Sequence, residues 1–362
     1  MNYRRLGRTG FKVGEIGLGT EYLHSTSRET IKKVLDLALD SAINYLDMFF
    51  AEPNFRDNIG SALGKKRDKM IIAGHIGTSY ENGQYKVTRE RKVAEIVFYD
   101  LLARLKTDYI DVLMIHWVDQ DNFQEAKVED LIEFAISLKE QGKIRTLGLS
   151  CHKVPAAINA IKSGVIDVLM FPVYLTKNVF KKYEEVYLTC EKEDIGLVAM
   201  KPFEGGKLLW ETGGYKISPL QCLSYVLSIK QVSTVVPGVK NVNELKENLN
   251  YLHSSKEEKN YIKAKDIINK SFIGAKDILN NSLLGECIFC NHCLPCPSKI
   301  NIGETIRLLE KVKYYSWKEL RAEYEKMPVK ASACIECGSC EARCFVDVDI
   351  IKNMKKAADI FE

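Results

Sequence analysis

Apolar runs and amphipathic segments alternate along residues 1–252, and this alternation limits the fold more than any other feature of the sequence. Short apolar runs indicate strands, and longer segments with apolar residues three and four positions apart indicate helices. The expected strands are residues 15–19, 44–48, 70–76, 109–117, 144–150, 165–174, 196–201 and 233–238. A helix is expected after each strand, which makes eight strand–helix units. An open doubly wound sheet rarely needs so many units, whereas a (β/α)8 TIM barrel needs this number and about this length.

Two more local features are predicted in this region. Residues 4–13 are expected to form a hairpin with its turn at residues 7–10, which contain two glycines. The helix after the third strand is expected to turn four apolar residues toward the sheet, namely Val93, Ile96, Val97 and Leu101. These features add detail to the barrel without changing its class.

The second to fifth expected strands each carry a polar residue at or next to their carboxyl end. Active sites of (β/α)8 barrels lie at the carboxyl ends of the strands. The residues at these ends are Asp47, His75, His116 and Ser150. A lone histidine is usually a structural residue, but two histidines and an aspartate on adjacent strand ends favour a functional site.

Eight of the 11 cysteines lie in two short runs. The first run contains Cys287, Cys290, Cys293 and Cys296, and the second contains Cys334, Cys337, Cys340 and Cys344. Three thiolates separated by two residues, with a fourth just beyond, form the ligand pattern of a [4Fe–4S] cluster. The fourth cysteine usually ligates the cluster of the other run. One predicted ligand set is therefore Cys287, Cys290, Cys293 and Cys344, and the other is Cys334, Cys337, Cys340 and Cys296.

Other uses of these cysteines fit the pattern less well. A disulfide framework needs an oxidising compartment, and the N-terminal residues show no signal peptide. Structural zinc usually takes two separated CxxC pairs rather than three thiolates in a row, although zinc or a single cluster stays an alternative. The remaining three cysteines, Cys151, Cys190 and Cys222, are expected to be packing residues.

The composition is that of an ordinary globular protein, with 46% hydrophobic and 28% charged residues among 362. A net charge of +4 is too small to indicate a nucleic-acid partner or an anionic membrane surface. No apolar run approaches the roughly 20 residues that span a bilayer. We therefore expect a cytoplasmic protein that binds neither nucleic acid nor membrane.

Several segments of the sequence resemble the aldo/keto reductase superfamily. They include Asn44-Tyr45-Leu46-Asp47, the run from Asp108 to Trp117, and the run from Gly142 to Ser150. The opening residues 5–10 and the late Pro237-Gly238 resemble the family as well. Together with the cysteine runs, the chain is similar to the iron–sulfur-containing branch of the family, in which a ferredoxin-like region follows the barrel.

The resemblance implies carbonyl reduction with NADPH by a tetrad of Asp, Tyr, Lys and His. Asp47 and His116 match two members of that tetrad, but Glu52 stands in the place of the tyrosine and His75 in the place of the lysine. A carboxylate and two histidines can still move protons near neutral pH. Alternatively, these four residues could converge on a metal, because two histidines and a carboxylate bind non-haem iron.

The resemblance also implies a nicotinamide cofactor, NADPH or NADH. Ser150 matches the serine that holds the carboxamide, and Lys201 lies in the loop that packs beside the nicotinamide. The adenosine and its phosphate would be held by Gly238, Lys240, Glu244, Glu247 and Asn248. A nicotinamide does not readily release single electrons, so a flavin is a further candidate cofactor.

We expect three parts: a barrel of residues 1–253, a helical linker of residues 254–283 and a mainly α-helical ferredoxin-like domain of residues 284–362. The leading hypothesis is an oxidoreductase whose barrel binds a small-molecule substrate with NAD(P)H or another two-electron donor and is coupled to two [4Fe–4S] clusters. A redox protein would then be a partner, and Lys355 and Lys356 could help it dock. The competing hypotheses are a non-enzymatic electron-carrying or redox-sensing adaptor and metal-assisted chemistry in the barrel.

Overall fold

A computed structural model describes most of the chain. The described residues are 1–81, 84–119, 126–176, 181–212, 215–273, 287, 289, 291–344 and 346–362. They form two compact units, one of residues 1–80, 87–203 and 218–270 and one of residues 81–86, 204–217 and 271–362. The predicted boundaries at residues 253 and 283 stay predictions, and residues 274–286, around the second of them, lie outside the described part.

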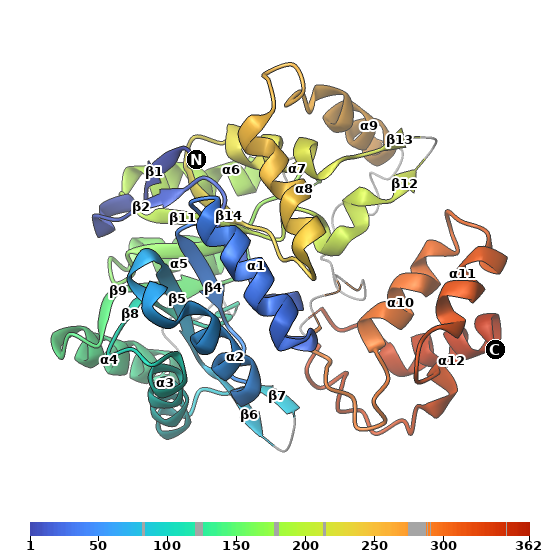
Figure 1. Cartoon of the computed structure of the whole chain (residues 1–362), viewed down its shortest axis with the longest axis horizontal. Coiled ribbons are helices and arrows are strands. Elements are labelled where there is room, and N and C mark those ends of the chain that lie inside the picture. The colour runs from blue at the N-terminus through green and yellow to red at the C-terminus, as the bar shows by residue number, and fades with distance from the viewer. Residues whose placement is uncertain are drawn as a thin grey trace. The chain divides into compact units, whose positions relative to one another are not determined.

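The first unit contains a sheet of eight parallel strands (Figure 1). In sheet order they are β3 (Leu18–Gly19), β4 (Tyr45–Met48), β5 (Ile71–Ile76), β8 (Ile110–Ile115), β9 (Ile144–Ser150), β10 (Val168–Pro172), β11 (Gly196–Met200) and β14 (Val232–Val236). Single bridges from Ile16 to Val235 and from Gly19 to Gly238 bring the two edges together. The sheet is therefore a nearly closed barrel, which confirms the predicted fold class.

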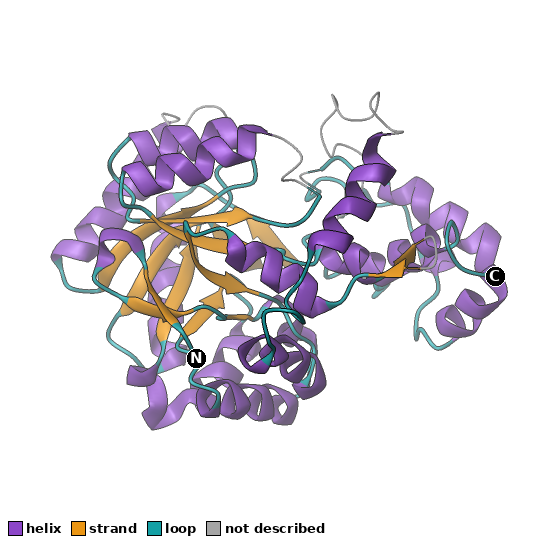
Figure 2. Cartoon of the chain, turned by 90° about the horizontal axis from the view of Figure 1, so that it is seen from above, coloured by secondary structure: helices purple, strands orange, loops and turns teal. Residues whose placement is uncertain are grey.

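Helices surround the strands, as Figure 2 shows. They are α1 (Arg28–Asp40), α2 (Pro53–Leu63), α3 (Arg91–Leu105), α4 (Ala126–Glu140), α5 (Val154–Lys162), α6 (Lys181–Lys192), α7 (Pro219–Ser228), α8 (Val242–His253) and α9 (Ile262–Ile273). Ser27 begins α1 and Ser218 begins α7, each accepting a backbone N–H in its first turn. The predicted orientation of α3 is wrong for Ile96, which is 70% exposed, because the buried stripe runs through Ala94, Val97 and Leu101.

The interior of the barrel is filled by apolar side chains from the strands together with Leu6 and Val13. These two residues belong to the predicted hairpin, whose strands are β1 (Tyr3–Arg5) and β2 (Lys12–Gly14). Gly7 has φ +52°, and a Cβ atom there would lie 2.2 Å from the backbone nitrogen of Gly196. The turn therefore needs glycine to approach the start of β11, at the end of the barrel opposite to the expected site.

The second unit is helical, as predicted for the C-terminal domain. Its helices are α10 (Ile302–Lys311), α11 (Trp317–Glu325) and α12 (Ile350–Phe361). They share a buried core in which Tyr324 stacks on Phe361 with ring centroids 4.9 Å apart. The hydroxyl of Tyr324 donates to Glu362 Oε1 at 2.7 Å and accepts from the backbone N–H of Ala331 at 2.6 Å. These bonds join the second cysteine run to the last helix.

Two small hairpins were not expected from the sequence. They are β6 (Thr78–Glu81) with β7 (Gln84–Val87), and β12 (Glu211–Thr212) with β13 (Tyr215–Lys216). Tyr85 lies parallel to the ring of His292, with centroids 5.1 Å apart, in the same compact unit. Trp210 packs on Phe289 at 5.9 Å. Segments 81–86 and 204–217 therefore pack with the loop of the first cysteine run.

Candidate active site and cluster sites

Asp47, His75 and His116 form one hydrogen-bonded chain at the carboxyl ends of β4, β5 and β8. His75 Nε2 lies 2.8 Å from Asp47 Oδ1, and His75 Nδ1 lies 3.1 Å from His116 Nδ1. All three residues are buried. Their strands are neighbours in the sheet, which is why residues 28 and 41 positions apart in the sequence meet.

The bonding pattern fixes where the protons lie when both rings are neutral. Asp47 can only accept, so His75 carries its proton on Nε2 and donates it to the carboxylate. His75 Nδ1 is then an acceptor, and His116 Nδ1 must donate to it. The proton of His116 is therefore directed to His75, and its Nε2 carries none. The chain can accept a proton at His116 and share the positive charge with Asp47.

An aromatic wall supports this chain. Phe49 stacks on the ring of His116 with centroids 5.5 Å apart and meets the edge of His75 at 6.3 Å. Phe50 packs beside Phe49 at 4.5 Å and stacks on His24 at 4.3 Å. Both phenylalanines directly follow β4 and are buried, so they hold the two imidazoles in place.

Glu52 does not join the chain. Its carboxylate accepts the backbone N–H groups of Asn54 at 3.2 Å and Phe55 at 2.5 Å, so it is the N-cap of α2. Pro53 occupies the first turn, where its missing N–H costs nothing. Among the described residues, no group of three or more His, Cys, Asp or Glu side chains is arranged to hold a single metal ion. The carboxylate that occupies the tyrosine position is thus used to begin a helix.

A second polar chain, not predicted from the sequence, lies at the ends of β8, β9 and β11. Lys201 Nζ lies 3.0 Å from His152 Nε2, and His152 Nδ1 lies 2.9 Å from Asp119 Oδ2. Asp119 also accepts from the indole of Trp117 and from the backbone of His152. Burial opposes the charge of Asp119, but His152 and these bonds lower its pKa to about 2. The sequence did carry a signal for this second chain, since its three residues lie one to four positions beyond a strand end.

Two residues near this chain have left-handed backbones. Trp117 has φ +52° and Lys201 has φ +60°, values that non-glycine residues adopt mainly where the surroundings impose them. Ser150 Oγ accepts the backbone N–H of Trp117 at 2.9 Å, and Ser150 is buried. The serine predicted to hold a carboxamide therefore also fixes the turn after β8.

Glu21 is a further residue that the sequence did not single out. It directly follows Thr20 at the end of β3 and begins the 3-10 helix of residues 21–25. Its Oε1 is buried and has no hydrogen-bond partner among the described residues. Burial raises the pKa of Glu21 to about 8; Lys201 opposes this rise and Asp47 adds to it. The side chain is thus held as a neutral acid close to both polar chains.

The predicted adenosine site lies between β14 and α8. Gly238 closely approaches the ring of Tyr22, because a Cβ atom there would lie 2.7 Å from it. The Lys240 backbone N–H donates to Glu244 Oε2 at 2.7 Å at the start of α8. Asn248 is buried, whereas Glu247 is exposed on the same helix. The carboxylate of Glu244 therefore stands at a helix N-terminus, where an anionic ligand group would otherwise be favoured.

In the second unit, one cavity brings together the four cysteines of a predicted ligand set. The cavity is lined by Cys296, Cys334, Cys337 and Cys340, with Ile300, Ile302, Ile351 and Met354 among its apolar walls. Cys296 belongs to the first run and the other three to the second run. The four iron corners of a cubane need thiolates that lie further apart than the ligands of a single metal ion. Four cysteines around one cavity therefore suit a cluster.

The other predicted ligand set is described in part, because Cys290 lies outside the described residues. Cys287, Cys293 and Cys344 pack in or against the core of this unit. Cys287 Sγ accepts the backbone N–H of Phe289 and Cys344 Sγ that of Val348, both at 3.4 Å. Such bonds to sulfur are typical of cluster ligands and tune their potential.

The arginine before Cys344 joins the two cysteine runs. Arg343 Nη2 donates to the backbone oxygens of Cys293 at 2.6 Å and Pro295 at 3.1 Å. Hydrogen bonds from a charged donor such as this guanidinium are stronger than those from a neutral donor. The first run and the end of the second run are therefore held side by side, as crossed ligation requires.

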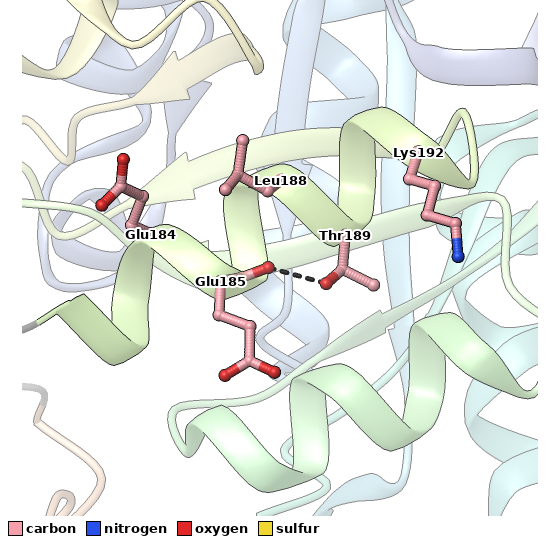
Figure 3. Close-up of a pocket in the computed structure, with 5 residues that line it drawn as sticks. All are labelled: Glu184, Glu185, Leu188, Thr189 and Lys192. Atoms are coloured by element: carbon pink, nitrogen blue, oxygen red, sulfur yellow. Dashed lines mark hydrogen bonds between the residues drawn. The ribbon is translucent and has the colours of Figure 1, made fainter.

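One shallow hollow lies outside both sites. It is formed on α6 by Glu184, Glu185, Leu188, Thr189 and Lys192, and Thr189 Oγ1 donates to the backbone oxygen of Glu185 at 2.7 Å (Figure 3). Its lining comes from a single exposed helix face and holds no convergent polar groups. We assign it no function.

No helix in the described ranges has the length and apolar character needed to cross a membrane.

Comparisons with known proteins assign a family to two parts of the chain. The sequence profile of the aldo/keto reductase family matches residues 14–221, and that of the 4Fe-4S dicluster domain matches residues 286–349. The chain therefore belongs to the aldo/keto reductase family and carries a C-terminal dicluster domain. The dicluster match implies two [4Fe–4S] clusters.

Individual relatives share part of the chain. The uncharacterized oxidoreductase YqkF of Bacillus subtilis is 29% identical over 214 residues, which cover 58% of this chain and 67% of that protein. The aldo-keto reductase YhdN of the same organism is 30% identical over 161 residues, 41% of this chain and 47% of that protein. An aldo-keto reductase structure from Bacillus halodurans, in its holo form, has a TM-score of 0.63 and 23% identity and covers 73% of this chain and 96% of that chain. The structural likeness shows the barrel fold.

Proposed function

We propose that the barrel carries out two-electron chemistry with a nicotinamide cofactor and a small carbonyl or alcohol substrate, and that the clusters exchange single electrons with a redox protein. The observation that carries the proposal is the buried chain from Asp47 through His75 to His116 at the carboxyl ends of three adjacent strands. A chain of this kind moves a proton to or from a reacting oxygen without leaving a charge unpaired.

The residues present fit a nicotinamide cofactor. Ser150 ends β9 and Lys201 follows β11, two strands that are separated only by β10. Gly238 and Lys240 lie just before α8, and Asn248 lies on it. The cofactor would supply or take a hydride. These residues of the protein would orient the cofactor and keep the reacting atoms beside His116.

Glu244 favours NADH over NADPH in this proposal. Its carboxylate accepts the Lys240 N–H at 2.7 Å and places negative charge at the start of α8. A 2′-phosphate bound there would meet this carboxylate, whereas a 2′-hydroxyl could donate to it. We therefore propose NADH as the preferred cofactor.

The second cluster is proposed as the exit to a redox protein. Cys337, one of the residues that line its cavity, is exposed, and the neighbouring Ile335 is 66% exposed. An exposed cluster edge shortens the path to a partner. Lys355 is paired with Glu336 at 2.8 Å on the same surface, so the patch has mixed charge. A partner with a small apolar contact and a few acidic groups would fit it.

Metal-assisted chemistry is not proposed, because the Glu52 carboxylate is bonded to the backbone of α2. A flavin gains no support from the family matches. It enters only as an outcome of the experiment below.

The test is an anaerobic titration of cluster-reconstituted protein with NADH and then NADPH, followed by the broad cluster absorbance. We expect NADH to bleach the clusters at a lower concentration than NADPH. Bleaching only after a flavin is added would place the one-electron converter outside the chain. Bleaching by dithionite but by neither nucleotide would contradict the proposal and favour an electron-carrying or redox-sensing adaptor.

A further inference from the structure

We propose that Glu21 donates the proton to the substrate oxygen when the barrel site works in the reducing direction. This role would replace that of the tyrosine whose position is occupied by Glu52. The inference rests on the proposed function, because it assigns a residue to the reaction of that same site.

The position of Glu21 places it at the site. It follows β3 at the carboxyl edge of the barrel, and Thr20 beside it donates to the backbone oxygen of Asp47 at 2.7 Å. Charged groups from two other elements act on it, Asp47 from β4 and Lys201 after β11. In its own element, His24 Nδ1 lies 2.6 Å from the Glu21 backbone oxygen. Glu21 is thus close enough to a member of each polar chain, Asp47 and Lys201, to feel its charge.

The Glu21 carboxyl is available for chemistry. Its Oε1 is buried and has no hydrogen-bond partner among the described residues, whereas the oxygens of Glu52 both cap α2. A buried carboxylate without such bonds is costly, so the neutral acid is favoured. The pKa of about 8 agrees with a group that still holds its proton at neutral pH. A site that must protonate an oxygen needs such a group.

The histidine chain cannot fill this role in its neutral form. Its protons point from His116 to His75 and from His75 to Asp47, and His116 Nε2 carries none. The chain is therefore a proton acceptor, and Glu21 is a proton donor. Pairs of groups whose surroundings set opposite protonation states mark acid and base assignments.

The step balances with NAD(P)H as the reductant. A hydride adds to the carbonyl carbon, and the electron pair of the C=O π bond moves to oxygen. The oxygen takes the proton from the Glu21 carboxyl, which becomes a carboxylate. The negative charge of nearby Asp47 disfavours that carboxylate, and the residue is only partly buried, so it regains a proton from solvent before the next turnover.

The test uses the full-length protein with both clusters and the variant Glu21→Gln. The matched control is Glu29→Gln, because Glu29 is an exposed residue of α1 paired with Lys33. Phenylglyoxal with NADH or NADPH is the activity probe. Glu21→Gln should lower kcat about 100-fold or more and leave KM within a few-fold, since a positioned acid contributes this much. Glu29→Gln should change neither.

A spectroscopic readout tests the acid without turnover. Infrared difference spectra at neutral pH should show a protonated-carboxyl band in the wild type and in Glu29→Gln but not in Glu21→Gln. Absence of that band in the wild type, or full activity of Glu21→Gln, would overturn the assignment of Glu21. A wild type that neither reduces the probe nor shows cluster bleaching by nucleotide would instead overturn the proposed function, and the role of Glu21 with it.

Discussion

His75 and His116 face each other through like nitrogens, with Nδ1 to Nδ1 at 3.1 Å. Only one proton fits between the two atoms, so the tautomer of one ring determines that of the other. Asp47 decides the tautomer of His75 from the far side, 2.8 Å from Nε2. A substitution of Asp47 is therefore expected to change the tautomer of His116 through His75.

Asp47→Asn tests this coupling. The amide can donate to His75 Nε2 and thereby reverse the direction of both hydrogen bonds, so His116 would carry its proton on Nε2 instead of Nδ1. We expect kcat with phenylglyoxal and nucleotide to fall about 100-fold or more, because the wrong tautomer disables such chains. Cluster absorbance should not change. Asp36→Asn is the control, because Asp36 is an ion-paired residue of α1 outside the site, and equal activity of the two variants would contradict the coupling.

Glu52→Ala tests whether Glu52 serves the helix or the chemistry. Loss of an N-cap costs about 0.5–2 kcal/mol of stability. We expect a lower denaturation midpoint of the barrel and a kcat within about two-fold of the wild type. Glu52→Asp keeps a carboxylate cap and should recover the stability. A large loss of kcat in both variants, with stability unchanged, would give Glu52 a catalytic role instead.

Much of the fold could be predicted from the sequence because its signals are local. Strand β8 is buried and apolar apart from Asp111, and α1 repeats apolar residues every three or four positions. The hairpins containing Thr78–Glu81 and Glu211–Thr212 are polar and short, so they lack such a pattern. Helix α12 does repeat it, through Ile350, Met354, Ala357 and Phe361, and could have been predicted.

The candidate site was only partly predictable. Asp47, His75 and His116 could be predicted from their positions at strand ends, because parallel strands bring their carboxyl ends to one rim of the barrel. The direction of the Glu52 side chain depends on where α2 begins, although Pro53 was a sequence signal for that start. Glu21 and His152 also lie just beyond strand ends, so their position was a sequence signal, but tertiary packing decides whether side chains in these turns face the site.

Cys296→Ser tests the crossed ligand set. Cys296 lines the cavity of Cys334, Cys337 and Cys340 although it belongs to the other run. We expect it to remove the same cluster as Cys337→Ser, with about half of the iron lost and the same electron paramagnetic resonance signal missing from the reduced protein. Cys222→Ala, in buried α7, should keep the full iron content. Loss of different signals in the two variants would contradict crossed ligation.

The stability of Glu21→Gln should depend on pH in a defined direction. The folded pKa of about 8 lies above the ordinary value of 4.5 for this carboxyl, so unfolding releases a proton between these values and wild-type stability falls as the pH rises through this window. Below about 4.5 the effect is absent, and above about 8 it is complete. Glutamine cannot ionise, so the variant should gain stability over the wild type as the pH rises from 5 to 9. A difference that stays constant over this range would contradict the raised pKa.

Glu244→Gln tests the cofactor preference. The amide oxygen can still accept the Lys240 N–H, but the negative charge at the start of α8 is gone. We expect NADPH to bind about tenfold more tightly than it does to the wild type. The repulsion between the carboxylate and the 2′-phosphate is about 1.4 kcal/mol, and removing it changes a binding constant by this factor. NADH binding should change by less than about threefold. Fluorescence titration of each nucleotide measures both constants, with exposed Glu247→Gln on the same helix as the control. If Glu247→Gln alone strengthens NADPH binding, Glu247 rather than Glu244 is the residue that repels the phosphate.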